Sequence, residues 1–331
     1  MYRFIAHLMV MSAVLGTSNV ALADMLLDEP LALANEQPFA QLANIPTAHS
    51  GAILAAGQTS WRTDVDIANN FVRDSRGGEK LVLDGESQRY QLGMRRGLSE
   101  TWEVGVQIPW LSYNGGVTDN FIKGWHKFWG LPDGGRPAYP NRRLNFFYQR
   151  NGVTEIDLHR AESGIGDVQF SAAYQWLRND RNALAWSFTA TAPTGSAHKF
   201  TGNGGGNLGI ALAATRYQLF DLPLTATANI GAMWLPEGDV LAAQQKHAAW
   251  FANGEIGWAA TQNLRLKIQL DANSALYDSD LITLGGDAVQ LLLGGSMRLS
   301  SHWLLDAAIG EDIRVDTAPD VTFHLALKAH F

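Results

Sequence analysis

From about residue 50 to the C-terminus, apolar and polar side chains alternate with a period of two. This period is typical of a β-strand whose two faces meet different surroundings. The clearest stretch is 102–110, where Trp, Val, Val, Ile and Trp alternate with Glu, Gly, Gln and Pro. We predict twelve strands, near 52–68, 80–95, 101–112, 165–177, 183–193, 207–219, 223–234, 248–259, 264–274, 287–299, 303–313 and 320–331. Each has the ~9–11 residues that a tilted strand needs to cross a bilayer.

The links between these strands alternate in length. Short links fall at 96–100, 177–182, 220–222, 260–263 and 300–302, and longer ones at 69–79, 111–164, 192–206, 235–247, 274–286 and 314–319. Barrels of the bacterial outer membrane have short periplasmic turns and long outer loops. The pattern therefore predicts an all-β fold, a transmembrane antiparallel up-and-down β-barrel of twelve strands in the outer membrane, with both termini in the periplasm.

Tryptophans lie near both ends of the predicted strands. Those toward the short links are Trp102, Trp176, Trp186, Trp258 and Trp303, and those toward the long loops are Trp110, Trp234 and Trp250. Indole rings favour the headgroup level of a membrane, so we expect two aromatic girdles. A secreted β-sandwich has alternating strands too, but it would rarely need tryptophan at both strand ends.

The last predicted strand ends in an aromatic residue, Phe331, which completes a row of apolar side chains at alternate positions. This ending resembles the signal by which bacterial outer-membrane proteins are recognised for assembly. We therefore expect the barrel-assembly machinery and outer-membrane lipid as partners.

Residues 1–23 have the form of a secretory signal peptide. Arg3 supplies the positive charge, 4–15 form the apolar core, and Ala-Leu-Ala at 21–23 is a small-x-small cleavage pattern. The mature chain is expected to begin at Asp24. We expect residues 24–50 to be either a periplasmic tail or a segment folded into the lumen, and 51–331 to form the barrel.

Composition excludes several other classes of protein. The formal net charge is -7, which argues against a nucleic-acid partner because such proteins need a basic stripe. The chain has no cysteine, which rules out disulfides and Cys-ligated metals. After residue 23 no stretch approaches the ~18 consecutive apolar residues of a transmembrane helix.

The longest predicted loop, 111–164, carries two features. Phe121, Trp125, Phe128 and Trp129 recur at helical spacing and predict a helix whose apolar face covers the barrel mouth, or contacts lipid or an apolar ligand. Asn-Gly at 151–152, between two strand-like stretches, predicts a hairpin that protrudes from the wall. If that hairpin belonged to the wall, the barrel would have fourteen strands, which is the alternative count.

The polar faces of the strands would line the lumen with charge. The candidate lumen or constriction residues are Arg62, Asp64, Asp66, Glu103, Asp167, Glu255, Arg265, Lys267, Asp271, Arg298 and Asp306. Mixed charge of this kind either fills and stiffens a barrel through cross-strand pairs or forms a constriction that selects solutes. The sequence leaves both interpretations open.

Signals for catalysis are weak. The histidines are scattered without metal-ligand spacing, and no Gly-x-Ser-x-Gly motif occurs. We expect no catalytic residue, no metal and no cofactor. A lipid-modifying barrel enzyme stays as an alternative, because it would need only serine and histidine on the lipid-facing surface.

Turn and loop motifs resemble known families. Gly-Ile-Gly-Asp at 164–167, Ala-Pro-Thr-Gly at 192–195 and the glycine-rich 202–206 are distantly similar to the phenol meta-pathway family of aromatic-uptake barrels. Segments 35–39, 124–126, 130–134, 311–312 and 317–321 resemble more closely an uncharacterised proteobacterial outer-membrane barrel family, domain of unknown function 3187. The resemblance covers most of the mature chain and implies fold and location, and it carries over no catalytic residue.

Together these observations predict a porin-like channel, narrow or plugged, for small apolar or amphipathic solutes. A lumen of twelve strands lies between that of a filled eight-stranded barrel and that of an aqueous sixteen-stranded porin. The alternatives are a non-transporting surface barrel with a filled lumen and the lipid-modifying enzyme.

Overall fold

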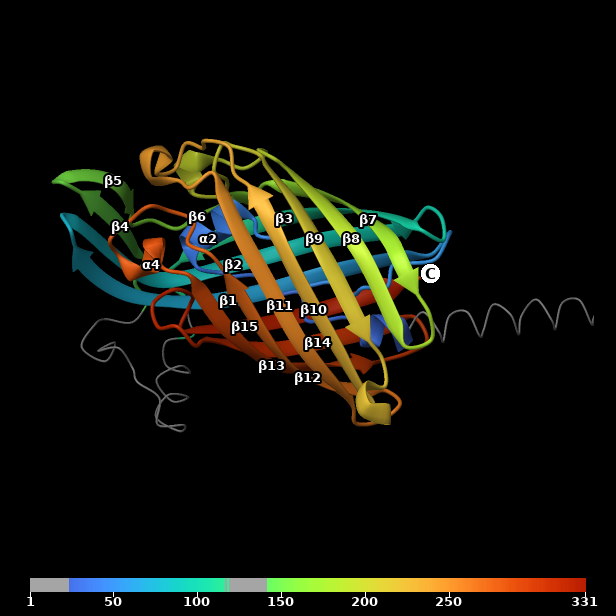
Figure 1. Ribbon diagram of the computed structural model, residues 1–331. Coiled ribbons are helices and arrows are strands. Elements are labelled where there is room, and N and C mark those ends of the chain that lie inside the picture. The colour runs from blue at the N-terminus through green and yellow to red at the C-terminus, as the bar shows by residue number, and fades with distance from the viewer. Residues whose placement is uncertain (1–23, 117, 119–141) are drawn as a thin grey trace, which may run out of the picture.

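The computed structural model describes residues 24–116, 118 and 142–331, and its strands form a closed antiparallel barrel (Figure 1). The barrel closes because β1 (Thr59–Arg76) pairs with both β2 (Glu79–Gly97) and the last strand, β15 (Val321–His330). The other wall strands are β3 (Trp102–Asn114), β6 (Glu162–Ile165) with β7 (Val168–Arg178), β8 (Asn182–Ala192), β9 (Asn207–Arg216), β10 (Leu224–Trp234), β11 (Ala248–Ala259), β12 (Leu264–Asn273), β13 (Ala288–Arg298) and β14 (Trp303–Asp312). The prediction of twelve wall strands is confirmed.

Two strands of the sheet lie outside the wall. β4 (Asn145–Arg150) pairs with the outer end of β2, and β5 (Val153–Leu158) pairs with β4, so this hairpin extends the long-loop end of the barrel (Figure 1). The predicted protrusion is therefore correct, and the fourteen-stranded alternative is wrong. The link predicted at 69–79 is also wrong, because β1 and β2 stay paired as far as Arg76 and Glu79.

The first strand begins later than the sequence pattern indicates. β1 starts at Thr59, whereas we predicted a strand from 52 and a barrel domain from 51. Residues 52–54 are apolar, but they are buried inside the barrel rather than in its wall. The misplaced boundary arose because a short buried apolar run has the same residue types as a strand.

β6 and β7 are two halves of one wall strand, since both pair with β3. The pairing is interrupted where Pro109 faces the junction of the two halves. Proline has no N–H to donate to the ladder, and the bond across the junction runs from the Gly166 N–H to the Pro109 carbonyl, at 2.8 Å. A second irregularity of the described wall is a register shift between Gln175 and Leu177, where β7 pairs with β8.

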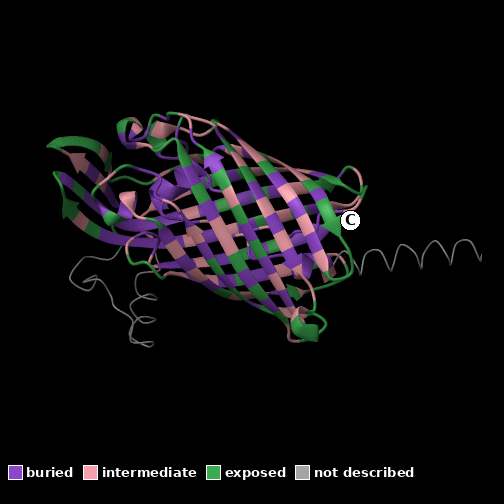
Figure 2. Ribbon diagram, in the orientation of Figure 1, coloured by how far each residue is buried: buried purple, intermediate pink, exposed green. Residues whose placement is uncertain are grey.

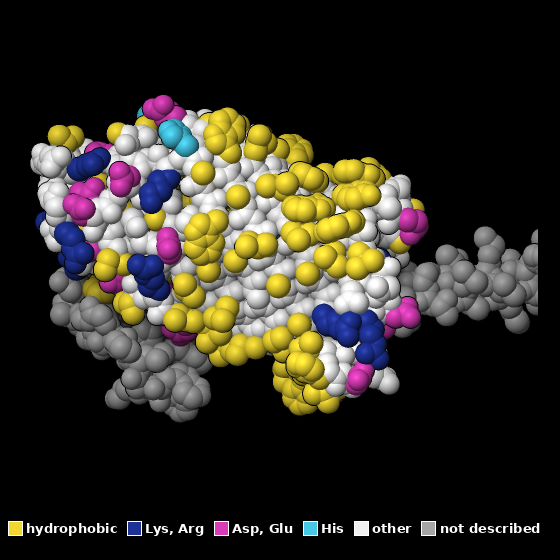
Figure 3. Space-filling view, in the orientation of Figure 1, with side chains coloured by type: hydrophobic (Ala, Val, Ile, Leu, Met, Phe, Trp, Pro, Cys, Tyr) yellow, Lys and Arg dark blue, Asp and Glu magenta, His cyan; other side chains and the backbone are white. Residues whose placement is uncertain are grey.

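The two faces of the wall differ as a membrane barrel requires. Alternate residues point outward as exposed apolar side chains and inward as buried polar ones, which gives the banded colouring of Figure 2. Hydrophobic side chains are spread over the outer surface of the wall in Figure 3, whereas charged ones gather toward its two ends. An apolar exterior around a polar interior is the arrangement of a barrel that spans a membrane.

Helices are few and short. Among the described residues they are a helical turn at 24–27, α2 (Pro38–Ala43), α4 (Ile282–Gly285) and the 3₁₀ turns η2 (Ala197–Lys199), η3 (Leu219–Asp221) and η4 (Ala242–Gln244). In the described residues, no helix has the length and apolar character to span a membrane.

The barrel lumen as the candidate functional site

Residues 24–58, which we call the plug segment, thread the barrel lumen as a hairpin. From residue 24 at the short-turn end, the segment runs to α2 near the long-loop end. There it turns and runs back to the start of β1 at Thr59. In Figure 1 the blue α2 lies inside the long-loop end of the barrel. Most residues of this segment are buried, and β1 begins after it at Thr59.

Residues 24–37 form the first arm of the hairpin, which we call the ascending arm. Wall side chains bind this arm at successive levels of the barrel. Near the short turns Asp28 forms an ion pair with Arg265, 2.6 Å between Oδ1 and Nε. Halfway up, the Leu31 N–H donates to Glu255 and Gln269, at 3.0 and 2.9 Å, and the Gln269 amide donates to the Leu31 carbonyl at 2.9 Å. Side chains of the wall thus satisfy a backbone that has no strand partner.

The turn of the hairpin is built by local capping. The Gln37 side chain accepts the N–H groups of Phe39 and Ala40, and Pro38 occupies the first helical position, where no donor is needed. Asn44 ends the helix in the left-handed region at φ 51°, which asparagine tolerates. A six-residue helix is therefore enough to reverse the chain inside the barrel.

α2 inserts an aromatic ring among the residues at the long-loop end. Phe39 packs edge-on against Phe200 and Tyr277, with ring centroids 5.1 and 5.9 Å away. Tyr113 contacts Phe200 and Phe146 in the same way and donates its hydroxyl hydrogen to Gln41 at 3.0 Å. These five rings, which we call the aromatic cluster, are buried and lie at the outer end of the lumen.

Residues 44–58 form the second arm of the hairpin, which we call the descending arm. Wall side chains on the opposite side of the lumen bind this arm. Near the long loops the Asn44 carbonyl accepts from Gln169 at 3.1 Å, and lower down the His49 imidazole is 2.7 Å from the Ser187 hydroxyl. Close to the short turns the Leu54 N–H donates to Glu103 at 2.7 Å. Both arms are therefore fixed along most of the length of the barrel.

Glu29 is the main ionic contact between the ascending arm and the wall. Its carboxylate pairs with Arg95 and lies 3.6 Å from Lys328, while its carbonyl accepts from Lys267. Burial alone would raise the pKa of Glu29, but the charges of Arg95 and Lys328 outweigh it and hold that pKa below its usual value. The carboxylate is therefore ionised and binds the segment to the wall.

A small cavity of about 70 Å³ remains between the plug segment and the wall. Glu29, His49, Arg62, Arg95 and Lys328 contribute to its lining. A volume of this size is sufficient for a few water molecules.

All of the predicted lumen residues lie on the inner side of the barrel or at its ends. Asp64, Asp66, Glu103, Asp167, Glu255, Lys267, Asp271 and Asp306 are buried, and Arg62, Arg265 and Arg298 are partly buried. The three arginines among them have different partners. Arg62 pairs with Asp64 on its own strand at 2.5 Å, whereas Arg265 and Arg298 pair with carboxylates of the plug segment.

Several charged lumen residues were missed by sequence reasoning. Arg89, Arg95, His324 and Lys328 occupy inward positions of β2 and β15, and His324 lies 2.6 Å from Asp66. Their place in the alternation could have identified those four. Glu29 had no such signal, because it lies in a segment without periodicity.

The remaining predicted residues divide into two groups. The helix proposed for Phe121, Trp125, Phe128 and Trp129 lies outside the described residues. The girdle residues Trp102, Trp110, Trp176, Trp186, Trp234, Trp250, Trp258 and Trp303 are on the outer face, and Phe331 is at the short-turn rim. Trp61, on the same face and 42% exposed, was not among the predicted girdle residues.

Comparison with known proteins places the chain in a family. The family described as "Protein of unknown function (DUF3187)" matches residues 5–331. The chain belongs to this family. No curated protein matches this DUF3187 chain.

Solved structures share the fold of this DUF3187 protein. The COG4313 outer membrane channel from Pseudomonas putida F1 is 13% identical, with a TM-score of 0.57 over 85% of this chain and 97% of that one. The Ralstonia pickettii toluene transporter TbuX is 11% identical, with a TM-score of 0.41 over 91% and 96%. The NanC porin is 9% identical, with a TM-score of 0.46 over 82% and 98%. At these identities the likeness to the first structure concerns the barrel fold, and we draw nothing from the other two.

Proposed function

We propose that this DUF3187 protein is an outer-membrane channel that its own plug segment closes, and that the plug segment must shift before a small apolar or amphipathic solute can pass. The observation that carries the proposal is the way in which the plug segment is bound. Its backbone is held by side chains such as Gln269, Gln169 and Glu103, and not by strand pairing. Contacts of this kind break one at a time without opening the wall.

The two ends of the lumen support an amphipathic solute. The aromatic cluster at the long-loop end would accommodate an apolar or aromatic ring, since such rings pack favourably against others at about 4.5–7 Å. Toward the short turns the cavity is lined by Glu29, Arg95 and Lys328, which would interact with a polar or charged group. A solute with an apolar and a polar part fits both regions.

A disulfide lock tests whether movement of the plug segment is required. The hydroxyl oxygens of Ser50 and Thr215 are 3.3 Å apart, one on the plug segment and one on β9, and the chain has no native cysteine. The variant Ser50→Cys/Thr215→Cys should bind the plug segment to the wall when oxidised. The readouts are planar-bilayer conductance and liposome uptake of benzoate, an amphipathic aromatic anion.

We expect oxidised protein to be closed and reduction with dithiothreitol to restore uptake, while the two single-cysteine variants behave like wild type in both conditions. Deletion of residues 24–49 should raise conductance. Equal uptake by the oxidised and the reduced Ser50→Cys/Thr215→Cys protein would show that the plug segment need not move at residue 50 for the solute to pass. The absence of both conductance and uptake in wild-type and truncated protein would instead favour the filled surface barrel, and lipid turnover in the same liposomes would favour the enzyme.

A further inference from the structure

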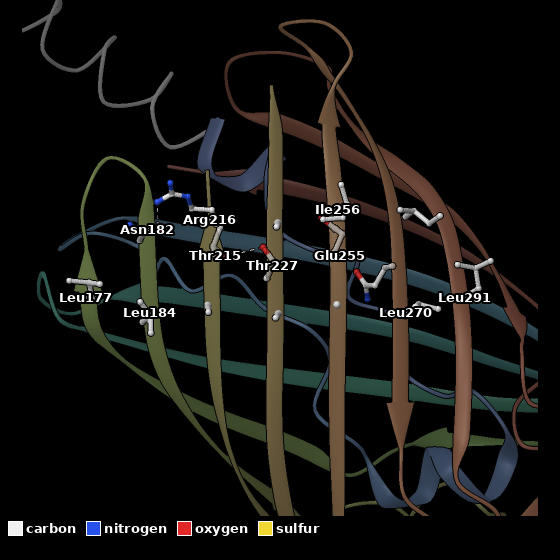
Figure 4. Close-up of a pocket in the computed structure, with 16 residues that line it drawn as sticks. Leu177, Asn182, Leu184, Thr215, Arg216, Thr227, Glu255, Ile256, Leu270 and Leu291 are labelled. Atoms are coloured by element: carbon white, nitrogen blue, oxygen red, sulfur yellow. Dashed lines mark hydrogen bonds between the residues drawn. The ribbon is translucent and has the colours of Figure 1, made fainter. Parts of the chain in front are cut away.

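The outer wall has a shallow apolar groove of about 650 Å³ that crosses the strands from β7 to β13 (Figure 4). Its floor is formed by the small outward residues Ala214, Ala226, Ala228 and Gly254. A Cβ atom built on Gly254 would meet no other atom within 4 Å, so the space above this residue is open. The groove faces the lipid side of the barrel and is separate from the lumen.

Larger apolar side chains lie toward the two ends of this groove. Leu177 and Leu184 lie toward one end, and Ile256, Leu270 and Leu291 toward the other. Six steps between neighbouring strands, at about 4.8 Å each, give the groove a length of about 29 Å. This long and narrow apolar shape matches an extended hydrocarbon chain.

A basic residue lies at the end of the groove nearest the short turns. Arg216 is the last residue of β9, and its guanidinium donates to the Asn182 side-chain oxygen at 2.8 Å (Figure 4). In the described parts of the chain, no carboxylate forms an ion pair with Arg216. By contrast Arg181, at the same end of the barrel, is paired with Asp221 at 2.7 Å.

An outward arginine without an anionic partner needs an explanation in a membrane barrel. Arginine on the lipid face is destabilising near the bilayer midplane but is tolerated near the interface, where the side chain reaches the headgroups. Since β9 ends at Arg216, the guanidinium lies at that level. Phospholipid headgroups carry a phosphate anion there, whose charge is complementary to the Arg216 guanidinium.

We infer that this groove is a binding site for a phospholipid of the leaflet at the short-turn end. One acyl chain lies along Ala214, Ala226 and Gly254, and the phosphate contacts Arg216, which Asn182 holds in position. The site does not depend on whether the lumen conducts a solute.

Lipid binding can be measured by native mass spectrometry of the detergent-solubilised barrel titrated with phosphatidylglycerol. Gly254→Leu fills the groove, and Arg216→Gln removes its charge. We expect each change to raise the Kd of the tightest-bound lipid roughly fivefold. This factor corresponds to the loss of about one basic contact at a membrane surface. Arg181→Gln and Ala232→Leu change residues that do not line the groove, so they are the matched controls and should leave binding unchanged.

Each variant is first shown to be folded by its altered migration on gels without heating. Equal lipid binding by wild type, Gly254→Leu and Arg216→Gln would overturn the proposal. Equal weakening in the two controls would also overturn it, because that result describes a non-specific lipid shell. Weaker lipid binding with Gly254→Leu but not with Arg216→Gln would overturn the headgroup contact. The mass of a dimer in place of the lipid adduct would overturn the lipid site and assign the groove to a second copy of the chain.

Discussion

Lys328 and Asp306 form an ion pair inside the barrel, 2.7 Å between Nζ and Oδ2, with both side chains almost completely buried. They lie on the neighbouring strands β15 and β14. Lys328 also donates to the Leu26 carbonyl at 3.3 Å, so one buried cation connects the wall with the plug segment.

Removal of one partner of this pair should strongly destabilise the barrel. We expect Lys328→Met to lower the free energy of unfolding by about 3–5 kcal/mol, since it leaves the Asp306 carboxylate buried without the cation that forms an ion pair with it. The measurement is the urea midpoint of the refolded barrel in detergent. The double variant Lys328→Met/Asp306→Leu removes both charges and should recover much of the loss; a double variant no more stable than the single one would contradict this explanation.

The stability of the plug segment near α2 should depend on pH through Glu36. Burial raises the pKa of this carboxyl to about 7, despite Arg89, whose Nη1 lies 3.8 Å away. A carboxyl whose pKa is higher in the folded state than its ordinary value of 4.5 stabilises that state as the pH falls from about 7 toward 4.5. Release of the plug segment, followed by protease access to it, should therefore be slower at pH 5 than at pH 8.

The control for this prediction is Glu36→Gln, which cannot ionise. It should protect the plug segment at pH 8 as well as wild type is protected at pH 5, and its pH dependence in this range should be small. A wild-type plug segment that becomes more accessible between pH 8 and pH 5 would show that another group dominates.

Phe331 should contribute to assembly through both its ring and its backbone. Its N–H and carbonyl bond reciprocally with Thr59 at 2.9 Å, at the closing seam of the barrel, and its ring stacks on His302 at 6.0 Å. Deletion of Phe331 should therefore lower the amount in the outer membrane more than Phe331→Ala, which keeps the backbone bonds. Phe331→Tyr is the control that keeps an aromatic ring, and quantitative blotting of membrane fractions measures all three. Wild-type levels of the deletion variant would show that the terminal aromatic has no part in assembly.

Asp167 should fix the loop at 193–206. Its two carboxylate oxygens accept the N–H groups of Gly195 and Asn203, at 2.8 and 3.2 Å. Hydrogen bonds to a charged group contribute about 1.5–3 kcal/mol each, so Asp167→Ala should loosen the loop and speed trypsin cleavage after the exposed Lys199. Asp157→Ala changes an exposed carboxylate on β5 and is the matched control. Unchanged cleavage in Asp167→Ala would show that other contacts hold the loop.

The wall was accessible to sequence reasoning because its signal is local. In-out alternation follows from the backbone of a single strand, so Trp102 and Glu103 reveal their opposite faces without knowledge of any neighbour. The even strand count and the alternation of link lengths follow from the same local signal. The candidate site was less accessible, since inward charges such as Asp306 could be recognised but their partners could not.

What the sequence by itself determined is therefore the barrel, its strand number and the two chemical surfaces of its wall. Only the tertiary structure decided the path of residues 24–58, because that segment has no period and its contacts depend on residues far away in the chain. Leu31 bonds to Glu255, 224 positions later, and Asn35 donates to the carbonyl of Thr317, 282 positions later. The closed barrel brings these groups together, and a polar lumen then supplies the hydrogen bonds that an extended backbone without a strand partner requires.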